Sequence, residues 1–189
     1  MKKIVIFASG SGSNAEKIIL HFKNSNQGNV AGIFSNNLHA KVLDISKNHN
    51  IPAVAFDKTA LSDGTVFDEI NKIKPDLIVL AGFLLKFPDN IIQKYPNQII
   101  NIHPALLPKY GGKGMYGMNV HRAILENKEN ETGISIHYVN EHYDEGGVIF
   151  QKTVNIEDCK TPEEIAQKVL ELEHEHFPLV IEKLITHNP

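Results

Sequence analysis

Residues 98–110 read Gln98-Ile-Ile-Asn-Ile-His-Pro-Ala-Leu-Leu-Pro-Lys-Tyr110. This stretch gives the clearest indication of the fold and of the candidate site. Apolar residues lead up to Asn101 and His103, and Pro104 stops the run. In a strand, residues i and i+2 point to the same face, so a carboxamide and an imidazole would lie side by side at the strand's end. Ligands of open α/β sheets bind outside the carboxyl ends of strands. The stretch therefore predicts a catalytic pair at a strand tip.

The earlier apolar runs predict more strands, and these alternate with helices. Continuously apolar, β-rich runs suit strands that are buried on both faces of a parallel sheet. The chain has such runs at residues 4–8, 30–34, 53–56 and 77–81, and helical patterns at 15–22, 39–49, about 62 to 73, and 88–94. This alternation predicts an α/β fold with a mostly parallel sheet and helices on both faces.

The pattern changes after Pro104. The sequence then predicts a helix, two strands and a long last helix, at residues 120–126, 132–139, 148–156 and 161 to about 185. Only the loop 141–147 separates the two strands, so we expect them to pair antiparallel. We expect a kink in the last helix at Pro178. The predicted sheet thus has seven strands, with an antiparallel C-terminal strand, in a single domain over residues 1–189.

Composition and charge narrow the classes of function. Hydrophobic residues make up 42% of the 189 residues, which is typical of a globular domain, and the net charge is −3 with His neutral. An acidic balance argues against a general nucleic-acid binder, and no apolar run approaches membrane-spanning length. The run at residues 4–8 is too short for a signal peptide, and the single cysteine, Cys159, excludes an internal disulfide. We expect a cytoplasmic monomer or homodimer without nucleic-acid or membrane partners.

The turn Ser9-Gly-Ser-Gly-Ser-Asn14 joins the first expected strand to the first helix. Glycines let a backbone approach an anion closely, and the amides and dipole at a helix N-terminus favour negative charge. The turn therefore suits a phosphate, although it lacks the remaining glycine of a dinucleotide fingerprint and the Gly-Lys pair of a P-loop. A tight turn in which Ser13 or Asn14 caps the helix explains the same residues equally well.

Ten histidines make a metal site worth considering, but their spacing argues against one. His174 and His176 are two residues apart on a helix and point to different sides. The sequence has neither a His-Glu-x-x-His motif nor a pair of cysteines, so we expect no metal. A serine hydrolase is also disfavoured, because Ser11 lacks the spacing of a Gly-x-Ser-x-Gly elbow.

His103 differs from the other histidines because Asn101 lies beside it and a proline-locked turn follows it. A carboxamide can donate to a developing oxyanion, and an imidazole can take a proton during acyl transfer. Asp144, in the loop Asp144-Glu-Gly-Gly147, could orient or charge the imidazole or could simply begin a turn. His137 lies on an expected strand. These residues favour direct transfer of an acyl group to an amine, without a covalent enzyme intermediate.

The segments Asn101-Ile-His-Pro-Ala-Leu-Leu-Pro-Lys-Tyr110 and Asp144-Glu-Gly-Gly147 resemble the two signatures of the folate-dependent formyltransferases. The turn at residues 9–14 resembles the phosphate loop of the family member that acts on glycinamide ribonucleotide, and Ala81-Gly-Phe83 and Glu173-His174 match that member too. The resemblance covers nearly the whole chain. It implies a Rossmann-like formyltransferase fold. It also implies transfer of the formyl group of 10-formyltetrahydrofolate, a co-substrate, to the amine of glycinamide ribonucleotide in purine synthesis.

The resemblance also implies a role for individual residues. Asn101, His103 and Asp144 would be the catalytic trio, with His137 as a nearby support. In the N-terminal half, the ribonucleotide phosphate would be bound by Gly12, Ser13 and Asn14, while Glu173 would bind the ribose hydroxyls. The C-terminal half would carry catalysis and hold the folate, which would contact Leu84, Leu85, Lys86, Phe87, Asn101, Asn140, Glu141, His142, Tyr143 and Asp144.

Two features depart from the family's pattern. The family commonly has an arginine after Gly82-Phe83, where this chain has Leu85 and then Lys86, and an ammonium does not replace a guanidinium. The glycine-rich loop at residues 111–117 is longer than the pattern predicts. It would be either a substrate lid or an insertion.

Three alternative functions fit the sequence less well. A formyltransferase for initiator tRNA would need a further C-terminal domain and a basic surface, whereas this chain is acidic and one helix follows its last expected strand. A formyltetrahydrofolate hydrolase carries an extra N-terminal domain, whereas the first strand here is expected to begin at Ile4. A non-catalytic nucleotide-binding module would have no use for Asn101, His103 and Asp144.

Overall fold

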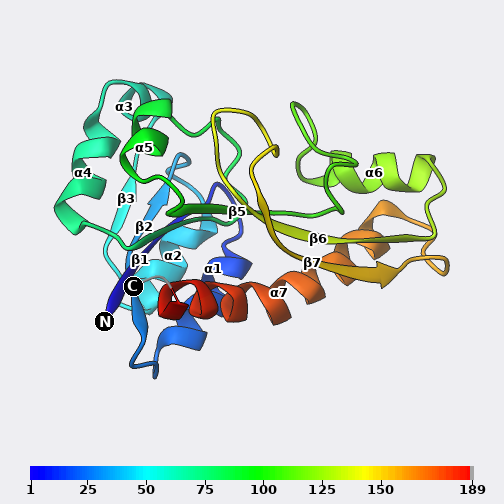
Figure 1. Cartoon of the computed structure of the whole chain (residues 1–189), viewed down its shortest axis with the longest axis horizontal. Coiled ribbons are helices and arrows are strands. Elements are labelled where there is room, and N and C mark those ends of the chain that lie inside the picture. Colours follow the sequence, from blue (N-terminus) through cyan, green and yellow to red (C-terminus); the bar gives the residue numbers. More distant parts are fainter. Residues whose placement is uncertain (188–189) are drawn as a thin grey trace.

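The computed structural model describes residues 1–187, which form one seven-stranded sheet flanked by helices (Figure 1). The strands are β1 (Lys2–Phe7), β2 (Gly28–Ser35), β3 (Ala53–Ala55), β4 (Leu77–Leu80), β5 (Ile99–His103), β6 (Glu131–Tyr138) and β7 (Val148–Asn155). The helices are α1 (Ser13–Phe22), α2 (Lys41–Asn48), α3 (Lys58–Ser62), α4 (Thr65–Ile73), α5 (Asp89–Lys94), α6 (Met118–Glu126) and α7 (Pro162–His187). All seven expected strands are present, so the predicted α/β fold is confirmed.

The order of the strands across the sheet is β3-β2-β1-β4-β5-β6-β7. The first five pair in parallel, and β6 runs antiparallel to both β5 and β7. The expected antiparallel pairing of the last two strands is therefore confirmed. The chain builds the sheet outward from β1 in one direction and then returns to place β4 on the other side of β1. This reversal leaves a crevice at the carboxyl ends of β1 and β4, where α/β proteins bind ligands.

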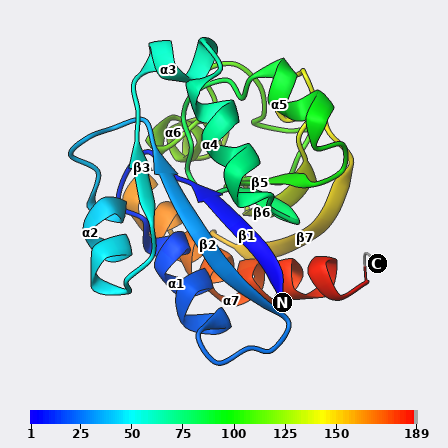
Figure 2. The ribbon, with the colours of Figure 1, turned by 90° about the vertical axis from the view of Figure 1, so that its left-hand side faces the viewer.

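Helices lie on both faces of the sheet (Figure 2), and alternate residues of the central strands pack against the two layers. Ile4 and Ile6 of β1 face α1, α2 and α7, whereas Val5 and Phe7 face α3, α4 and α5. Because both faces are covered, the central strands β1 and β4 are apolar over Ile4 to Phe7 and Leu77 to Leu80. The same alternation puts Ile100 and Ile102 of β5 into the first layer. Asn101 and His103 consequently share the opposite face, as their spacing predicts.

The helix expected from about residue 62 to 73 is present as α4 but begins a few residues later, and a short helix that was not expected, α3, precedes it. α3 ends at Ser62, and α4 begins at Thr65. Gly64 between them has φ 98°, a left-handed conformation that glycine adopts without a steric penalty. Asp57 caps α3 by accepting from the backbone N–H of Ala60 at 2.8 Å. The apolar pattern of this region does not reveal the short helix α3.

The long last helix, α7, passes through Pro178 and lies along one face of the sheet (Figure 1). It buries Phe177, Ile181 and Ile185 against the core. Within residues 1–187, no helix is both long enough and apolar enough to cross a membrane.

Candidate active site

A cavity of about 680 Å³ opens at the carboxyl ends of β1, β4 and β5. Asn14 of α1 and Glu173 of α7 line it, and so do the segments that follow β4 and β6. Asn101 and His103 line its middle, together with His137 and Asp144. Residues from six separate parts of the chain thus meet around one space of the size that holds a small-molecule ligand.

Asn101 is held by a histidine on the neighbouring strand. His137 lies directly opposite Asn101 in the antiparallel pairing of β5 and β6, and the Asn101 Nδ2 is 3.1 Å from the His137 Nε2. The His137 Nδ1 donates to the carbonyl oxygen of Tyr138 at 2.9 Å, so in the neutral ring Nε2 carries the lone pair. The Asn101 carboxamide therefore donates one N–H to His137. Its second N–H remains available to a ligand in the cavity.

His103 is 3% exposed and has an acceptor on each side of its ring. Its Nε2 donates to the carbonyl oxygen of Tyr110 at 2.7 Å, and its Nδ1 lies 3.6 Å from the Asp144 Oδ2. Burial lowers the pKa of His103 below its ordinary value of 6.5, although the Asp144 charge and the Tyr110 carbonyl both act in the opposite direction. The ring is consequently neutral near pH 7 and able to accept a proton at Nδ1.

Asp144 reaches the site from the loop between β6 and β7, with a left-handed backbone at φ 57°. Its Oδ2 accepts from the backbone N–H of Gly112 at 2.9 Å, and its Oδ1 lies 3.5 Å from the His137 Nε2. Burial raises the pKa of this carboxyl, but the His137 bond, the His103 charge and the Gly112 N–H together bring the pKa below its ordinary value. The ionised carboxylate therefore lies close to two imidazoles, those of His103 and His137.

Glu173 is a second carboxyl group that lines the cavity, and it is buried. Its Oε2 accepts from the Asn14 Nδ2 at 2.6 Å, a contact that joins α7 to α1. Burial raises the pKa of Glu173 to about 7, and the Asn14 bond opposes that change only in part. The Oδ1 of Asn14 is buried and has no hydrogen-bond partner in the protein. A polar pair therefore points into the cavity beside the N-terminus of α1.

The structure supports part of the expected phosphate loop. The N-cap of α1 is Gly12, which has φ 75°, and neither Ser13 nor Asn14 caps the helix with its side chain. The alternative in which these side chains serve as caps is therefore wrong. A Cβ at Gly12 would come within 2.7 Å of the Val42 side chain, so packing against α2 also requires glycine here. Ser11 and Asn14 line the cavity, whereas Gly12 and Ser13 are not among its lining residues.

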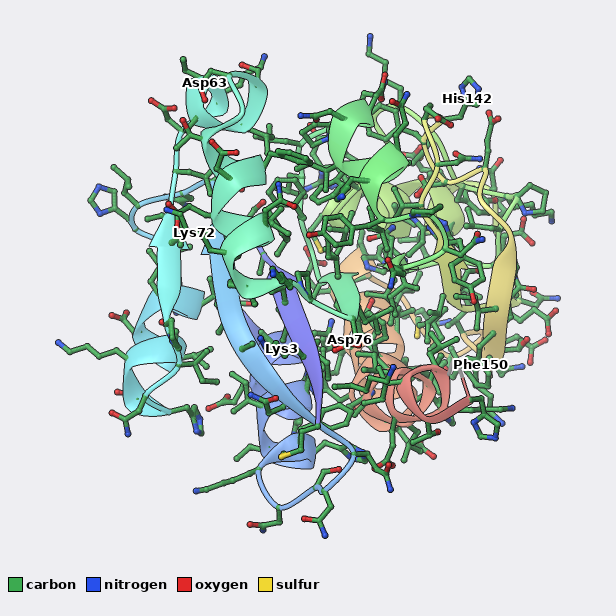
Figure 3. The ribbon with its side chains drawn as sticks, turned by 60° about the vertical axis from the view of Figure 1, so that its left-hand side comes forward. Lys3, Asp63, Lys72, Asp76, His142 and Phe150 are labelled. Carbon is green, nitrogen blue, oxygen red and sulfur yellow. The ribbon has the colours of Figure 1, made fainter. Side chains whose placement is uncertain are left out.

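All the residues predicted to contact folate line the cavity, including the loop at residues 140–144. Phe87 and Phe83 pack on Phe7, with ring centroids 5.0 Å and 5.3 Å apart, which gives this part of the cavity an apolar floor. The Nζ of Lys86 lies 3.3 Å from the Asp89 Oδ1, so its charge is directed to a neighbour on α5. The exposed side chain of His142 stands on the outer loop before β7, at the rim of the site (Figure 3).

The sequence left one contribution to the cavity open between two interpretations and did not reveal another. Residues 112–118 form part of its wall, which favours the lid interpretation of the glycine-rich loop over a remote insertion. His121 of α6 also lines it and is 5% exposed, and its Nδ1 has no partner. Burial, with a smaller effect from His103, lowers the pKa of His121 to about 4. Only the helical spacing of α6 could have indicated that this histidine points inward.

The turn that follows β5 is fixed by Ser135, which lies opposite His103 in the β5–β6 pairing. Its hydroxyl donates to the Ala105 carbonyl at 2.7 Å and accepts from the backbone N–H of Leu107 at 2.9 Å. The chain after Pro104 is thereby held against β6. Across the described residues 1–187, no group of three or more His, Cys, Asp or Glu side chains is arranged to hold a metal ion.

The fold and this site identify the class of protein. A family model described as "Formyl transferase" matches residues 2–181, so the chain belongs to the formyl transferase family. Among its relatives, phosphoribosylglycinamide formyltransferase of Bacillus subtilis is 35% identical over 191 residues, a match that covers 98% of this chain and 95% of the relative. The enzyme of the same name from Bacillus halodurans has a solved structure with a TM-score of 0.89 and 32% identity, covering 100% of this chain and 97% of that one.

The plant relatives are longer than this chain. The chloroplastic phosphoribosylglycinamide formyltransferase of Arabidopsis thaliana is 37% identical over 187 residues, which are 95% of this chain but 64% of the relative. The chain therefore spans just under two thirds of that protein's length.

Proposed function

We propose that this protein transfers the formyl group of 10-formyltetrahydrofolate to the amine of glycinamide ribonucleotide, giving formyl-glycinamide ribonucleotide and tetrahydrofolate in purine synthesis. One observation carries the proposal. A single cavity joins the Asn14–Glu173 pair to the cluster of Asn101, His103, His137 and Asp144. Relatives that bear the name phosphoribosylglycinamide formyltransferase match nearly the whole chain.

The ribonucleotide occupies the end of the cavity beside α1. The backbone of the turn at residues 12–14 binds its phosphate, because free amides and the helix dipole favour an anion there. Glu173 accepts from the ribose hydroxyls, for which its buried carboxylate is a strong acceptor. The Asn14 carboxamide, whose oxygen has no protein partner, contributes a further polar contact.

The folate occupies the opposite end, between the segment at residues 84–87 and the loop at residues 140–144. The apolar surface formed by Phe83 and Phe87 suits the flat pterin ring. Binding from the two ends brings the formyl carbon and the attacking amine together at Asn101 and His103, which turns a bimolecular step into one within a complex.

The amine nitrogen attacks the formyl carbon, and the carbonyl oxygen gains negative charge. The N–H of Asn101 that is not bound to His137 donates to this oxyanion. The amine loses one proton, which the His103–Asp144 pair holds, and the bond from the formyl carbon to the folate nitrogen then breaks as that nitrogen regains a proton. His137 supports the reaction by fixing the direction of the Asn101 carboxamide.

We propose that one domain performs these steps, with ribonucleotide binding in its N-terminal half and folate binding and catalysis in its C-terminal half. The single cysteine is in keeping with a cytoplasmic protein that acts on small molecules. A monomer or a homodimer remains our prediction for its assembly.

The proposal is tested by mixing the protein with both substrates and following deformylation of the folate. Formyl transfer that depends on the ribonucleotide supports it. Turnover without the ribonucleotide would indicate a hydrolase, and no turnover would leave only a binding module. His103→Ala should lower kcat at least about a hundredfold, because the proton acceptor is lost. An unchanged kcat would refute the role of His103.

A further inference from the structure

Tyr110 and Glu129 hold the catalytic histidine from outside the reacting centre. We propose that the hydrogen bond between their side chains is a positioning device. It fixes the Tyr110 carbonyl against His103 and so keeps that ring in its Nε2–H form, with Nδ1 directed at Asp144. This inference rests on the proposed function, since it concerns the proton acceptor of that reaction.

The backbone of Tyr110 adopts a conformation that a bulky residue rarely takes. Its φ is 56°, in the left-handed region. Such a residue keeps this conformation only where its surroundings hold it. The conformation directs the Tyr110 carbonyl at the His103 Nε2, 2.7 Å away. A backbone atom in a glycine-rich segment therefore decides which nitrogen of the catalytic ring carries the proton.

The phenol of Tyr110 supplies the restraint. Its hydroxyl donates to the Glu129 Oε1 at 2.8 Å. Glu129 lies in the turn between α6 and β6, and its backbone N–H donates to the Ile124 carbonyl at 3.3 Å. The preceding residue, Lys128, donates to Leu125 at 3.0 Å. The acceptor is thus fixed to the end of a packed helix, while the ring of Tyr110 packs on the core beneath it.

The same segment also binds the second catalytic group. Two residues after Tyr110, the backbone N–H of Gly112 donates to the Asp144 Oδ2 at 2.9 Å. Residues 110–112 therefore bind both His103, through the Tyr110 carbonyl, and Asp144, through the Gly112 N–H. The other titratable groups facing His103 are His137 of β6 and His121 of α6, and neither contacts the Tyr110 carbonyl. Release of the phenol would loosen both bonds without removing a side chain that meets substrate.

Tyr110→Phe tests this inference, because it removes one hydroxyl and leaves the ring. We expect kcat to fall about tenfold, with the KM of each substrate within about twofold of wild type. Nitrogen-15 NMR of His103 should show the Nε2–H tautomer in the wild type and a mixture of tautomers in the variant. Glu129→Leu should reproduce both changes. The double variant should be no worse than either single one, since one interaction is lost in all three.

Two further variants separate positioning from a general effect on folding. Glu129→Gln keeps an oxygen that accepts from the phenol, and it should restore kcat and the tautomer. The Lys109 Nζ lies 3.0 Å from the Glu129 Oε1 and is the other partner of that carboxylate. Lys109→Met removes this partner and should leave both kcat and the His103 tautomer unchanged. Wild-type kcat and a wild-type tautomer in Tyr110→Phe would overturn the inference. The NMR measurement needs no substrate, so it tests the inference whether or not the wild type transfers a formyl group.

Discussion

Asp144, which is partly buried, and Glu173, which is buried, are two carboxyl groups that line one cavity, and their pKa values move in opposite directions. The Asp144 side chain is 12% exposed and Glu173 is 8% exposed, so burial opposes ionisation of both. Around Asp144, two imidazoles and the N–H of Gly112 outweigh burial and lower the pKa. Glu173 has one carboxamide donor and no cation, and its pKa rises to about 7. The neighbouring groups, together with the deeper burial of Glu173, decide the charge of each carboxyl group.

The difference suits two different tasks. In the proposed reaction, a carboxylate that stays ionised between two histidines would stabilise the proton that leaves the amine. A carboxyl with a pKa near 7 loses its proton readily when hydroxyl donors arrive. Pairs of titratable groups with opposite pKa shifts are characteristic of enzyme active sites.

The largest expected effect comes from removing the charge of Asp144, which makes it resemble Glu173 when Glu173 is protonated. Asp144→Asn keeps an oxygen for the Gly112 N–H but removes the charge that stabilises a protonated His103. We expect kcat to fall about a thousandfold with little change in KM, because the charge acts mainly after the proton has moved. Steady-state kinetics measures this. Glu145→Gln, at the exposed next residue, is the matched control. A loss of less than about tenfold would show that Asp144 does not hold the proton.

Part of the candidate site could be predicted from the sequence. The alternation of apolar and polar residues in β5 was enough to place Asn101 and His103 on one face, since strand geometry leaves no other choice. Asp144 was expected near His103, but its contact with His137 depends on the β5–β6 register and a left-handed loop residue.

Other parts of the site could not have been read from the sequence. The carbonyl of Tyr110 is a backbone atom, so no residue type reveals its position. Gly12 indicated a phosphate loop, yet the structure shows that its nearest constraint is the Val42 side chain. The short helix α3 was not predicted, because its five residues are too few to show a helical period of apolar residues. These features depend on contacts between distant segments, which local patterns do not encode.

The second effect concerns stability, and Glu173→Gln tests it. The folded-state pKa of about 7 is raised from an ordinary value of 4.5. The wild type therefore has its full stability below pH 4.5 and loses some as the pH rises through 7, since the folded state holds the proton more tightly. A glutamine never ionises and escapes this loss. The variant should gain about 3 kcal/mol relative to wild type between pH 4 and pH 8.

Urea unfolding at a series of pH values measures the difference. Glu171→Gln, at an exposed position of the same helix, should run parallel to wild type over this range. If the Glu173→Gln and wild-type curves were also parallel, Glu173 would be ionised at pH 7 in the folded protein. Burial would then fail to distinguish it from Asp144.

The smallest expected effect is on the binding of the ribonucleotide. If ionised Glu173 accepts from the ribose hydroxyls, the ligand binds the deprotonated form, and a pKa of about 7 limits affinity below that pH. The dissociation constant of wild type should fall about tenfold from pH 6 to pH 8, as measured by calorimetry. The phosphate also titrates near pH 6, so Glu173→Gln supplies the baseline. The Glu173→Gln variant should bind the ribonucleotide more weakly, and its dissociation constant should vary with pH only through the phosphate. Equal slopes in the two proteins would mean that the ribose binds without drawing a proton from Glu173, and the raised pKa would then have no part in substrate binding.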